Sequence, residues 1–548
     1  MRLQRLNRIP VEICRARGTR MNSRTGGFIM KAIVSVGAIL SASVVLVSAR
    51  TEATTCESLV SLHLPNSTTI TSAVSVGASG TTPDHCEVLG ISRPTNDSLI
   101  HFEVLLPVAW NGKYLQAGNG GYGGTLATPL GGMLTALARG YAAGGTDMGH
   151  NAADPVWALG HPERIADWGY RANHVTAQAA KAIVHAFYGR SPRLSYFSGC
   201  SDGGHEALME AERFPEEFDG IIAGASANYW THQSVAWVWE GAAALANPAS
   251  ALSDDKLRLV TAAAVAACDG IDGLVDGLID DPRNCHFDPA SLQCHGPETP
   301  TCLTSAQVAA VNKIYAGPRN PRTGVQIYPG LERGSEFAAI SNDTLSVLVG
   351  SWHTLVSGPV PFLGDLFFKQ MVFNNLNWDF RTLDYDHDVA FADARMASII
   401  NSTNPDLSEF REQGGKLIMY HGWNDPLVNP RNSINYYQSV VAASRDEEGE
   451  DSDGGARATQ RFLRLFMAPG MTHCFAGPGP NVFDTLTALE RWVEQGRPPE
   501  RLIASGGAVP GRTRPLCVYP KVARYVGHGS INDAENFECV TPERGDDD

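Results

Sequence analysis

Two dipeptides bring together the residue types of a nucleophile and a base. Cys200-Ser201 lies in the G-x-S-x-G sequence of residues 199–203, and His473-Cys474 lies far along the chain. A serine hydroxyl becomes a strong nucleophile only when a base within hydrogen-bond reach removes its proton. If the two cysteines bond to each other, one disulfide would hold the serine and histidine loops together. The pattern therefore predicts a Ser–His pair for nucleophilic catalysis.

A carboxylate that orients the histidine would complete a catalytic triad. Asp425 follows an apolar run and lies between Ser201 and His473 in the chain, which gives the order typical of α/β-hydrolases. His421 and Asp202 are the alternatives for the base and the acid. We favour Asp425 because Asp202 directly follows the serine, where its backbone N–H, not its side chain, would face the reaction. We expect His421 to be structural or to line the pocket.

An oxyanion formed by attack on a carbonyl group needs two backbone N–H donors. Asp202 is the predicted source of the first. The second should come from the glycine-rich run 116–124, since glycine lets a backbone approach a ligand oxygen closely. Gly120 and Gly121 are the candidates. A phosphate-binding loop is the alternative, but the run lacks the G-x-x-x-x-G-K-[ST] pattern.

Short apolar segments precede each of these residues and predict the elements that position them. The predicted strands are residues 194–198, 218–225, 416–420 and 461–467, with a further strand-like segment at 113–115. A helix is predicted over 205–214, where His205 is expected to be structural. Functional residues just after strand ends are typical of an open α/β sheet. We therefore predict an α/β-hydrolase core.

A long insertion separates the predicted nucleophile from the predicted acid. Residues 228–405 are rich in loop signals and hold half of the ten tryptophans: Trp230, Trp237, Trp239, Trp352 and Trp378. We interpret this segment as a lid domain over the site. The catalytic domain would then comprise residues 50–227 and 406–548.

Two acidic stretches are candidates for metal binding. Residues 268–280 repeat aspartate every three or four positions between glycines. Clustered carboxylates and free carbonyl groups suit calcium, but the spacing is not that of an EF-hand, and a run of Asp-Gly turns explains it equally well. The acidic run 446–455 is predicted to be a solvated loop.

The N-terminus has the features of an export signal. Residues 1–31 carry eight Lys/Arg and one Glu, and an apolar run from Ala32 to Val47 precedes the small residues Ser48 and Ala49. We predict a signal segment over residues 1–49, with Met30 as an alternative start and a membrane anchor as the alternative role. Without it, 35 basic and 57 acidic residues leave a net charge of −22, which argues against nucleic acid as a partner.

Cysteine usage agrees with export. Eleven cysteines occur, and ten lie beyond the predicted signal segment. An even number in an exported chain favours disulfides. No C-x-x-C pair occurs, so a zinc ribbon is not expected. We expect a secreted or periplasmic protein that has no membrane association once the signal segment is removed.

Because of its Cys-Ser…Asp…His-Cys arrangement, the chain resembles the tannase and feruloyl esterase family, which also includes the hydrolase of the terephthalate monoester. The resemblance covers essentially the whole mature chain and implies an α/β-hydrolase core with an inserted lid. It implies the catalytic residues Ser201, Asp425 and His473. It also implies five disulfides: Cys200–Cys474, Cys56–Cys86, Cys268–Cys285, Cys294–Cys302 and Cys517–Cys539.

The resemblance further implies a structural calcium ion in the lid and no organic cofactor. The implied ligands are the carboxylates of Asp269, Asp272 and Asp276 and the backbone oxygens of Leu274 and Leu278. Such an ion would lie far from the reacting groups and would stabilise the lid.

We therefore expect a serine carboxylesterase that hydrolyses small aromatic esters of the feruloyl or galloyl type, attached to a plant polysaccharide or a tannin. The terephthalate monoester is the less favoured substrate, since its free carboxylate needs a cation in the pocket. Arg381, Arg395 and Lys369 lie in the predicted lid, but such side chains are mostly exposed. A serine peptidase and a non-catalytic calcium-stabilised binding protein are the alternatives from other classes.

Overall fold

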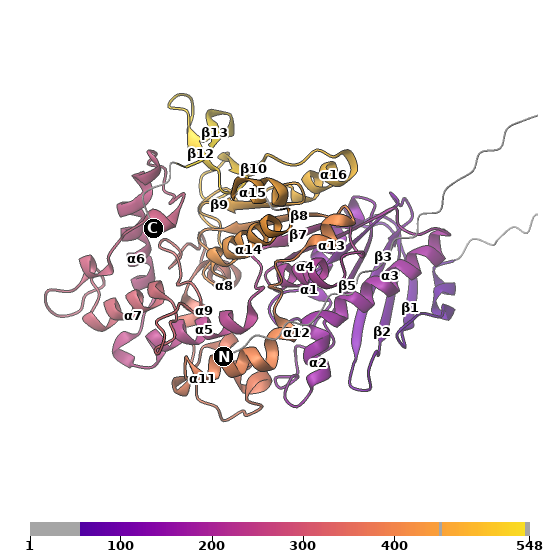
Figure 1. Ribbon diagram of the computed structural model, residues 1–548, viewed down its shortest axis with the longest axis horizontal. Helices are drawn as coiled ribbons and strands as arrows, with labels where there is room; N and C mark the ends of the chain where they lie inside the picture. The colour runs from indigo at the N-terminus through magenta and orange to yellow at the C-terminus, as the bar shows by residue number, and fades with distance from the viewer. Residues whose placement is uncertain (1–54, 449–451, 543–548) are drawn as a thin grey trace, which may run out of the picture. The chain divides into compact units, whose positions relative to one another are not determined.

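A nine-stranded sheet carries the candidate residues (Figure 1). The computed structural model describes residues 55–448 and 452–542, so the predicted signal segment 1–49 lies outside the described residues. The strands lie in the order β1-β2-β3-β5-β4-β6-β7-β8-β9. Their bounds are Thr69–Val76, His85–Ser92, Ile100–Pro107, Lys113–Ala117, Ala142–Thr146, Leu194–Cys200, Gly220–Gly224, Lys416–Gly422 and Leu463–Ala468 for β1 to β9.

Six neighbouring strands run parallel to one another, namely β5, β4, β6, β7, β8 and β9 in that order across the sheet. β1, β2 and β3 form an antiparallel extension that joins the sheet through β3 and β5. The parallel strands are short and almost fully buried, as strands covered on both faces must be. All five strand segments predicted from the sequence are confirmed, and so is the α/β class.

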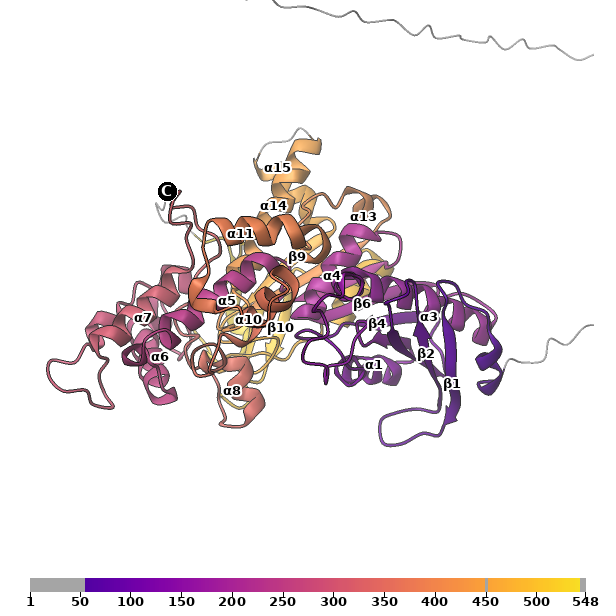
Figure 2. The ribbon, with the colours of Figure 1, turned by 90° about the horizontal axis from the view of Figure 1, so that it is seen from below.

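Helices cover both faces of this sheet (Figure 2). The helices α3 (Ala172–Tyr188), α4 (Asp202–Arg213) and α14 (Pro430–Glu448) pack their apolar sides into one buried cluster. On the other face, α1 (Ala127–Ala138) and α16 (Thr485–Gln495) contribute to a second cluster. The short helix α2 spans Pro162–Ala166. The sheet is thus the middle layer of three, as in a doubly wound α/β fold.

The predicted insertion leaves the sheet after β7 and returns at β8, its parallel neighbour. It contains no strand of the nine-stranded sheet. Its aromatic core, which includes Trp230, Trp237 and Trp352, is continuous with residues of the catalytic part such as Trp157 and Trp168. Its helices are α5 (Trp230–Leu245), α6 (Asp254–Cys268), α7 (Ser305–Ala316), α8 (Thr344–Gly350), α9 (His353–Val356), α10 (Phe362–Leu366), α11 (His387–Ala392) and α12 (Ser398–Ile400), and α13 (Ser408–Glu412) follows it before β8. The lid boundaries at 228 and 405 stay a prediction.

The structure corrects the loop predicted over residues 446–455, because the described residues of this run are helical. Helix α14 continues to Glu448, and α15 begins at Ser452 and ends at Gln460. A Cβ on Gly455 would lie 2.7 Å from the carbonyl oxygen of Val441 on α14. Gly455 therefore allows two helices to pack closely and does not mark a solvated loop.

Two hairpins and five disulfides complete the described part. β10 (Arg501–Ser505) pairs with β11 (Thr513–Cys517), and β12 (Val522–Tyr525) pairs with β13 (Phe537–Val540). The disulfides join the pairs that the resemblance implied, namely Cys56–Cys86, Cys200–Cys474, Cys268–Cys285, Cys294–Cys302 and Cys517–Cys539. Among the described helices, none has both the length and the apolar composition that a membrane span requires.

Candidate active site

Ser201 stands on the sharp turn between β6 and α4. Its φ of 67° lies in the left-handed region that residues with a side chain rarely adopt. Glycines make the turn possible, because a Cβ on Gly199 would collide with the backbone of Gly203. A Cβ on Gly203 would lie 2.8 Å from the carbonyl oxygen of Asn119. The turn projects Ser201 from the carboxyl edge of the sheet, as the G-x-S-x-G pattern predicts.

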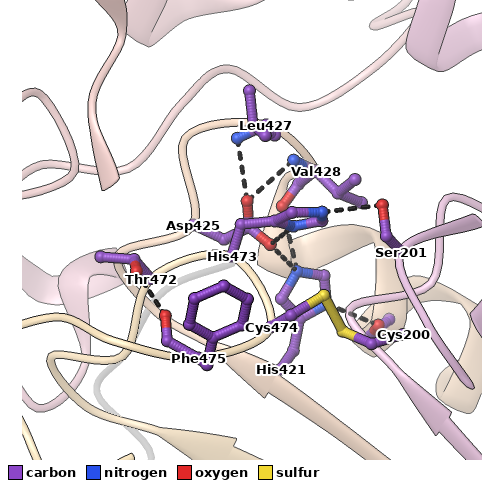
Figure 3. Close-up of a disulfide and its surroundings, with 11 residues drawn as sticks. Cys200, Ser201, His421, Asp425, Leu427, Val428, Thr472, His473, Cys474 and Phe475 are labelled. Carbon is purple, nitrogen blue, oxygen red and sulfur yellow. Dashed lines mark hydrogen bonds and ion pairs between the residues drawn. A yellow bond between two sulfur atoms is a disulfide. The ribbon is translucent and has the colours of Figure 1, made fainter. Parts of the chain in front are cut away.

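His473 lies between Ser201 and Asp425 (Figure 3). Its Nε2 is 2.7 Å from the Ser201 Oγ, and its Nδ1 is 2.7 Å from the Asp425 Oδ2. The carboxylate accepts from Nδ1–H, so Nε2 is free to accept the serine proton. The three residues come from loops after β6, β8 and β9. This is the geometry that a nucleophile, a base and an orienting acid require.

Asp425 is fully buried and accepts four hydrogen bonds. Its Oδ1 accepts from the backbone N–H groups of Leu427 and Val428, and its Oδ2 accepts from His473 and His421. Burial by itself would raise the pKa of Asp425. The two histidines outweigh that effect and hold the pKa of this carboxyl well below its usual range. The acid therefore stays ionised and keeps its charge for a protonated His473.

His421, the alternative base, does not contact the serine. Its Nε2 lies 3.0 Å from the Asp425 Oδ2 and 3.0 Å from the carbonyl oxygen of Val428. Both atoms are acceptors, so Nε2 must carry the proton, while Nδ1 accepts from the Ser433 hydroxyl at 2.7 Å. His421 thus holds the acid in place, which agrees with the structural role expected for it.

The disulfide Cys200–Cys474 joins the neighbours of Ser201 and His473, with a Cα–Cα distance of 5.9 Å (Figure 3). Cys474 has a φ of 66°, so the histidine loop turns sharply at the bond. The insertion holds the same loop, because the N–H of His473 donates to the carbonyl oxygen of Val349 on α8 at 3.0 Å. The base is therefore fixed from both sides.

The glycine loop after β4 lies across the pocket from His473, and Gly120 and Gly121 both line it. The N–H of Gly120 donates to the side chain of Asn119 at 2.9 Å. In the described part of the chain, no acceptor is present for the N–H of Gly121 or for that of Asp202, the first residue of α4. Of the three predicted oxyanion donors, Gly121 and Asp202 therefore retain a free N–H.

Asn119 fixes the position of this loop. Its N–H donates to the carboxyl group of Glu206 on α4, at 3.2 Å and 3.0 Å from the two oxygens, and its carbonyl oxygen accepts from the N–H of Gly203. Its side-chain amide donates to the carbonyl oxygens of Thr125 and Thr146. The glycine loop and the helix that follows the serine are thereby joined by direct hydrogen bonds.

Two acidic side chains of α4, close to the turn that carries Ser201, are buried. Burial raises the pKa of Asp202 to about 8 and that of Glu206 to about 8. The side chain of Asp202 points to His205, at 3.1 Å, and not to His473. Burial lowers the pKa of His205 to about 4. As expected, His205 is structural and Asp202 offers only its backbone to the site.

A pocket of about 870 Å³ opens over Ser201 and His473. Its lining is mostly apolar and aromatic, with Asn119, Thr128 and Thr354 as polar residues besides the catalytic groups. The insertion and the loop after β8 contribute Trp230, Trp237, Leu345, Leu348, Val349, Thr354, Leu363, Leu427 and Val428, and the histidine loop contributes Phe475. The insertion thus lines the pocket that it is predicted to cover.

No lysine or arginine is among the described residues that line this pocket. Lys369 pairs with Asp365 at 2.9 Å, and Arg381 pairs with Asp379 at 3.0 Å on an exposed surface. Arg395 donates to the carbonyl oxygen of Met371. All three cations of the insertion that were weighed for binding a carboxylate are engaged elsewhere.

The loop predicted to bind calcium closes on its own first residue. Both carboxylate oxygens of Asp269 accept backbone N–H groups, from Asp276 and Gly277 at 2.9 Å each. The backbone of the loop thus holds the carboxylate of Asp269, and in the described residues no three acidic or histidine side chains converge as a ready cluster. Asp276 also pairs with Arg514 on β11 and with Arg512.

Three contacts at the site were not predicted from the sequence. Glu206 could have been suspected, because it lies one helical turn after Asp202 on a helix whose neighbouring residues are apolar. Asn119 lies within the glycine-rich run predicted to supply an oxyanion donor, but no role was predicted for Asn119 itself. Val349 acts through its backbone carbonyl group, for which no sequence signal exists.

Residues 86–540 match the family described as tannase and feruloyl esterase. An esterase of Xanthomonas campestris pv. campestris is 41% identical, with 94% of this chain and 95% of that one covered. A mono(2-hydroxyethyl) terephthalate hydrolase of Piscinibacter sakaiensis is 35% identical over 84% of this chain and 85% of that one. The crystal structure of feruloyl esterase B from Aspergillus oryzae superposes with a TM-score of 0.78 at 29% identity, covering 88% of this chain and 99% of that one.

Proposed function

The chain belongs to the tannase and feruloyl esterase family and is a carboxylic ester hydrolase, and from that premise we propose that it cleaves phenolic esters with Ser201, His473 and Asp425. The observation that carries the proposal is the unbroken chain of hydrogen bonds from the Ser201 Oγ through His473 to Asp425, with both distances at 2.7 Å. It lies at the floor of an apolar pocket large enough for an aromatic ester.

The first half of the reaction forms an acyl-enzyme. Ser201 Oγ attacks the ester carbonyl carbon while His473 Nε2 takes the hydroxyl proton. The carbonyl oxygen becomes negative and accepts from the free N–H groups of Asp202 and Gly121. His473 then gives its proton to the alcohol oxygen as the carbon–oxygen bond breaks, and the ionised Asp425 stabilises the imidazolium in between.

The second half repeats these steps with water. His473 removes a proton from a water molecule, which attacks the acyl carbon, and the serine leaves with the proton that His473 returns. The acid product then departs, and the groups of the site are restored. The same N–H donors stabilise both tetrahedral intermediates, since both place negative charge on the same oxygen.

Phenolic acids of the feruloyl or galloyl type are the proposed acyl groups. Trp230 and Trp237 support this choice because aromatic walls pack well against a phenolic ring. The relative from Piscinibacter sakaiensis is named for a terephthalate monoester, whose free carboxylate would have no cationic partner among the described lining residues. That substrate is therefore the second candidate.

Hydrolysis of methyl ferulate, methyl gallate and monomethyl terephthalate by the wild type and by Ser201→Ala tests the proposal. We expect turnover of the first two at a higher kcat/KM than the third, and loss of all turnover in the variant. A feruloyl amide tests the peptidase alternative. Cleavage of the amide but of none of the esters, by oxidised and calcium-loaded protein, would overturn the proposal.

Calcium in the loop 269–278 is a further part of the proposal. The carboxylates of Asp269, Asp272 and Asp276 and the backbone oxygens of Leu274 and Leu278 would hold it. The closure of the loop on Asp269 supports this assignment. The ion would neutralise clustered carboxylates and supply no chemistry to the reaction, and no organic cofactor is needed for ester hydrolysis by this triad.

Export is proposed on two grounds. Five disulfides within the described residues suit an oxidising compartment, and residues 1–49 have the sequence of a signal segment. N-terminal sequencing of the protein from the periplasm and culture medium tests this. An N-terminus near Arg50 is the expected result, and full-length protein confined to the cytoplasm would contradict it.

A further inference from the structure

We propose that helix α8 and Phe475 bind the alcohol part of the ester, and that this subsite selects bulky, apolar, uncharged alcohols. The inference rests on the proposed function, since it assumes that the ester is cleaved by Ser201 and His473. It assigns the two sides of the substrate to two different parts of the pocket.

The pocket has a closed part and an open part. Trp230 and Trp237 are 1% and 2% exposed and form the closed part. The open part is formed by Leu345 and Leu348 of α8 and by Phe475, which are 53%, 39% and 43% exposed. Both parts belong to the pocket that Ser201 lines, so an ester bound at the serine can extend one substituent into each.

The open part holds two of the exposed leucines of the molecule. Only four leucines in the described part of the chain are strongly exposed, and two of them are Leu345 and Leu348. The other two, Leu99 and Leu376, do not line the pocket. Isolated exposed leucines need no explanation, but two on one short helix that line the same pocket as the exposed Phe475 form a surface that a ligand can cover.

The position of His473 indicates which substituent binds there. The histidine must reach the alcohol oxygen to protonate it when the ester bond breaks, so the alcohol lies on the histidine side of the serine. Phe475 is two residues from His473 on the same loop, and its N–H donates to the His473 carbonyl oxygen at 2.8 Å (Figure 3). α8 is bound to this loop through Val349, which accepts the N–H of His473 at 3.0 Å.

The order of product release leads to the same assignment. The alcohol leaves first, while the acyl group stays bonded to Ser201 until water arrives. The first product must therefore depart through the open part, and the retained acyl group occupies the closed part. Residues of the open part then contact the alcohol and have little contact with the acyl group.

Charge sets the chemical class of that alcohol. No aspartate, glutamate, lysine or arginine is among the described residues that line the pocket, and His473 is occupied by the reaction. An ionised alcohol would lose hydration against Leu345, Leu348 and Phe475 without gaining a partner. An aryl-alkyl alcohol would instead cover apolar surface that is exposed to water in the free enzyme.

Kinetics with matched esters test the assignment. The readout is the ratio of kcat/KM for 2-phenylethyl cinnamate to that for methyl cinnamate, which share the acyl group and differ in the alcohol. We expect the wild type to prefer the phenylethyl ester about tenfold, the effect of covering the two half-exposed leucines. We expect the double substitution Leu345→Ala with Leu348→Ala to bring the ratio close to one.

Leu376→Ala is the matched control, because Leu376 is an exposed leucine of the same insertion, 46% exposed, outside the pocket. It should keep the wild-type ratio. The inference is overturned if the wild type shows no preference, or if the double variant loses activity on both esters equally and keeps the ratio. If the wild type hydrolyses neither ester nor methyl ferulate, the proposed function itself fails, which separates the two outcomes.

Discussion

At the scale of single residues, the buried acid Asp425 is the most constrained group of the site. Its four hydrogen bonds come from two histidines and two backbone N–H groups. The two histidines have different tasks although both bind the same oxygen. His473 reaches Ser201, whereas His421 is held by Ser433 and Val428 and only supports the acid.

Substitutions at these residues should therefore differ in severity. Asp425→Asn leaves His473 without a charged partner and in the wrong tautomer, and we expect kcat to fall about 10⁴-fold. His421→Phe removes one hydrogen bond to the charged acid, and we expect a loss of roughly 10- to 100-fold in kcat with little change in KM. Steady-state kinetics on methyl ferulate measure both. An unchanged kcat in Asp425→Asn would exclude the assigned acid.

Glu206 lends itself to a test by pH. Burial raises its pKa to about 8 from an ordinary 4.5, so the folded protein holds this proton more tightly than the unfolded chain does. The resulting stabilisation is complete at acidic pH and is lost as the pH rises through about 8. Glu206→Gln resembles the protonated acid, so its free energy of unfolding should fall less between pH 6 and pH 9 than that of the wild type.

The same residue has a role in positioning the glycine loop, which kinetics can separate from stability. Glu206→Gln keeps an acceptor for the N–H of Asn119 and should retain kcat at pH 6. Glu206→Ala removes that acceptor, as well as the titration, and should lower kcat more than it raises KM. Equal kcat values for the two variants would show that the contact does not position the loop.

At the scale of elements, the disulfide Cys200–Cys474 joins two loops that are 274 residues apart in the sequence. Replacing both cysteines by alanine should lower stability by about 5 kcal/mol in the chain-entropy view. Because the bond lies next to both reacting residues, kcat should also fall, by roughly 10- to 100-fold. Urea unfolding and kinetics on methyl ferulate report the two effects.

Removing Cys294–Cys302 is the control, since that bond closes a segment of only eight residues within the insertion. Its loss should lower stability less and leave kcat unchanged. Full turnover in the Cys200→Ala, Cys474→Ala variant would contradict an alignment role for the long-range bond.

The elements could be predicted from the sequence wherever a local pattern specifies them. A short apolar run predicts the strand before Ser201. The glycine motif predicts the turn at the serine, and an apolar helical face predicts the helix after it. The loop prediction for residues 446–455 was wrong because acidic and glycine residues usually mark loops, whereas Gly455 allows α15 to pack closely against α14. The attachment of α8 to the histidine loop depends on a backbone group over 120 residues away, which no local pattern encodes.

At the scale of the whole molecule, the loop proposed to bind calcium lies where the insertion meets the C-terminal hairpins. Asp276 pairs with Arg512 and with Arg514 of β11, so the loop joins segments that are far apart in the sequence. A cation in the loop would stabilise this junction by binding only the folded state. The effect should concern the stability of the protein, because the ligands do not line the catalytic pocket.

Chelation should therefore lower Tm by at least about 2 °C while leaving the kcat measured at 25 °C unchanged. Asp272→Asn should abolish the response of Tm to added calcium, whereas the exposed control Asp255→Asn should retain it. Differential scanning calorimetry with EDTA and with calcium measures the effect. A wild-type Tm that is insensitive to both additions would rule out the calcium site.

The central claim is that Ser201, activated by His473, forms the acyl-enzyme, and its most direct test is labelling with an aryl phosphonate followed by mass spectrometry of the intact protein and its peptides. The account predicts one adduct per chain, located on Ser201, with activity lost in proportion to labelling. Labelling should be absent in Ser201→Ala and much slower in His473→Ala. An adduct on another residue, or ester turnover that survives in Ser201→Ala, would contradict the account.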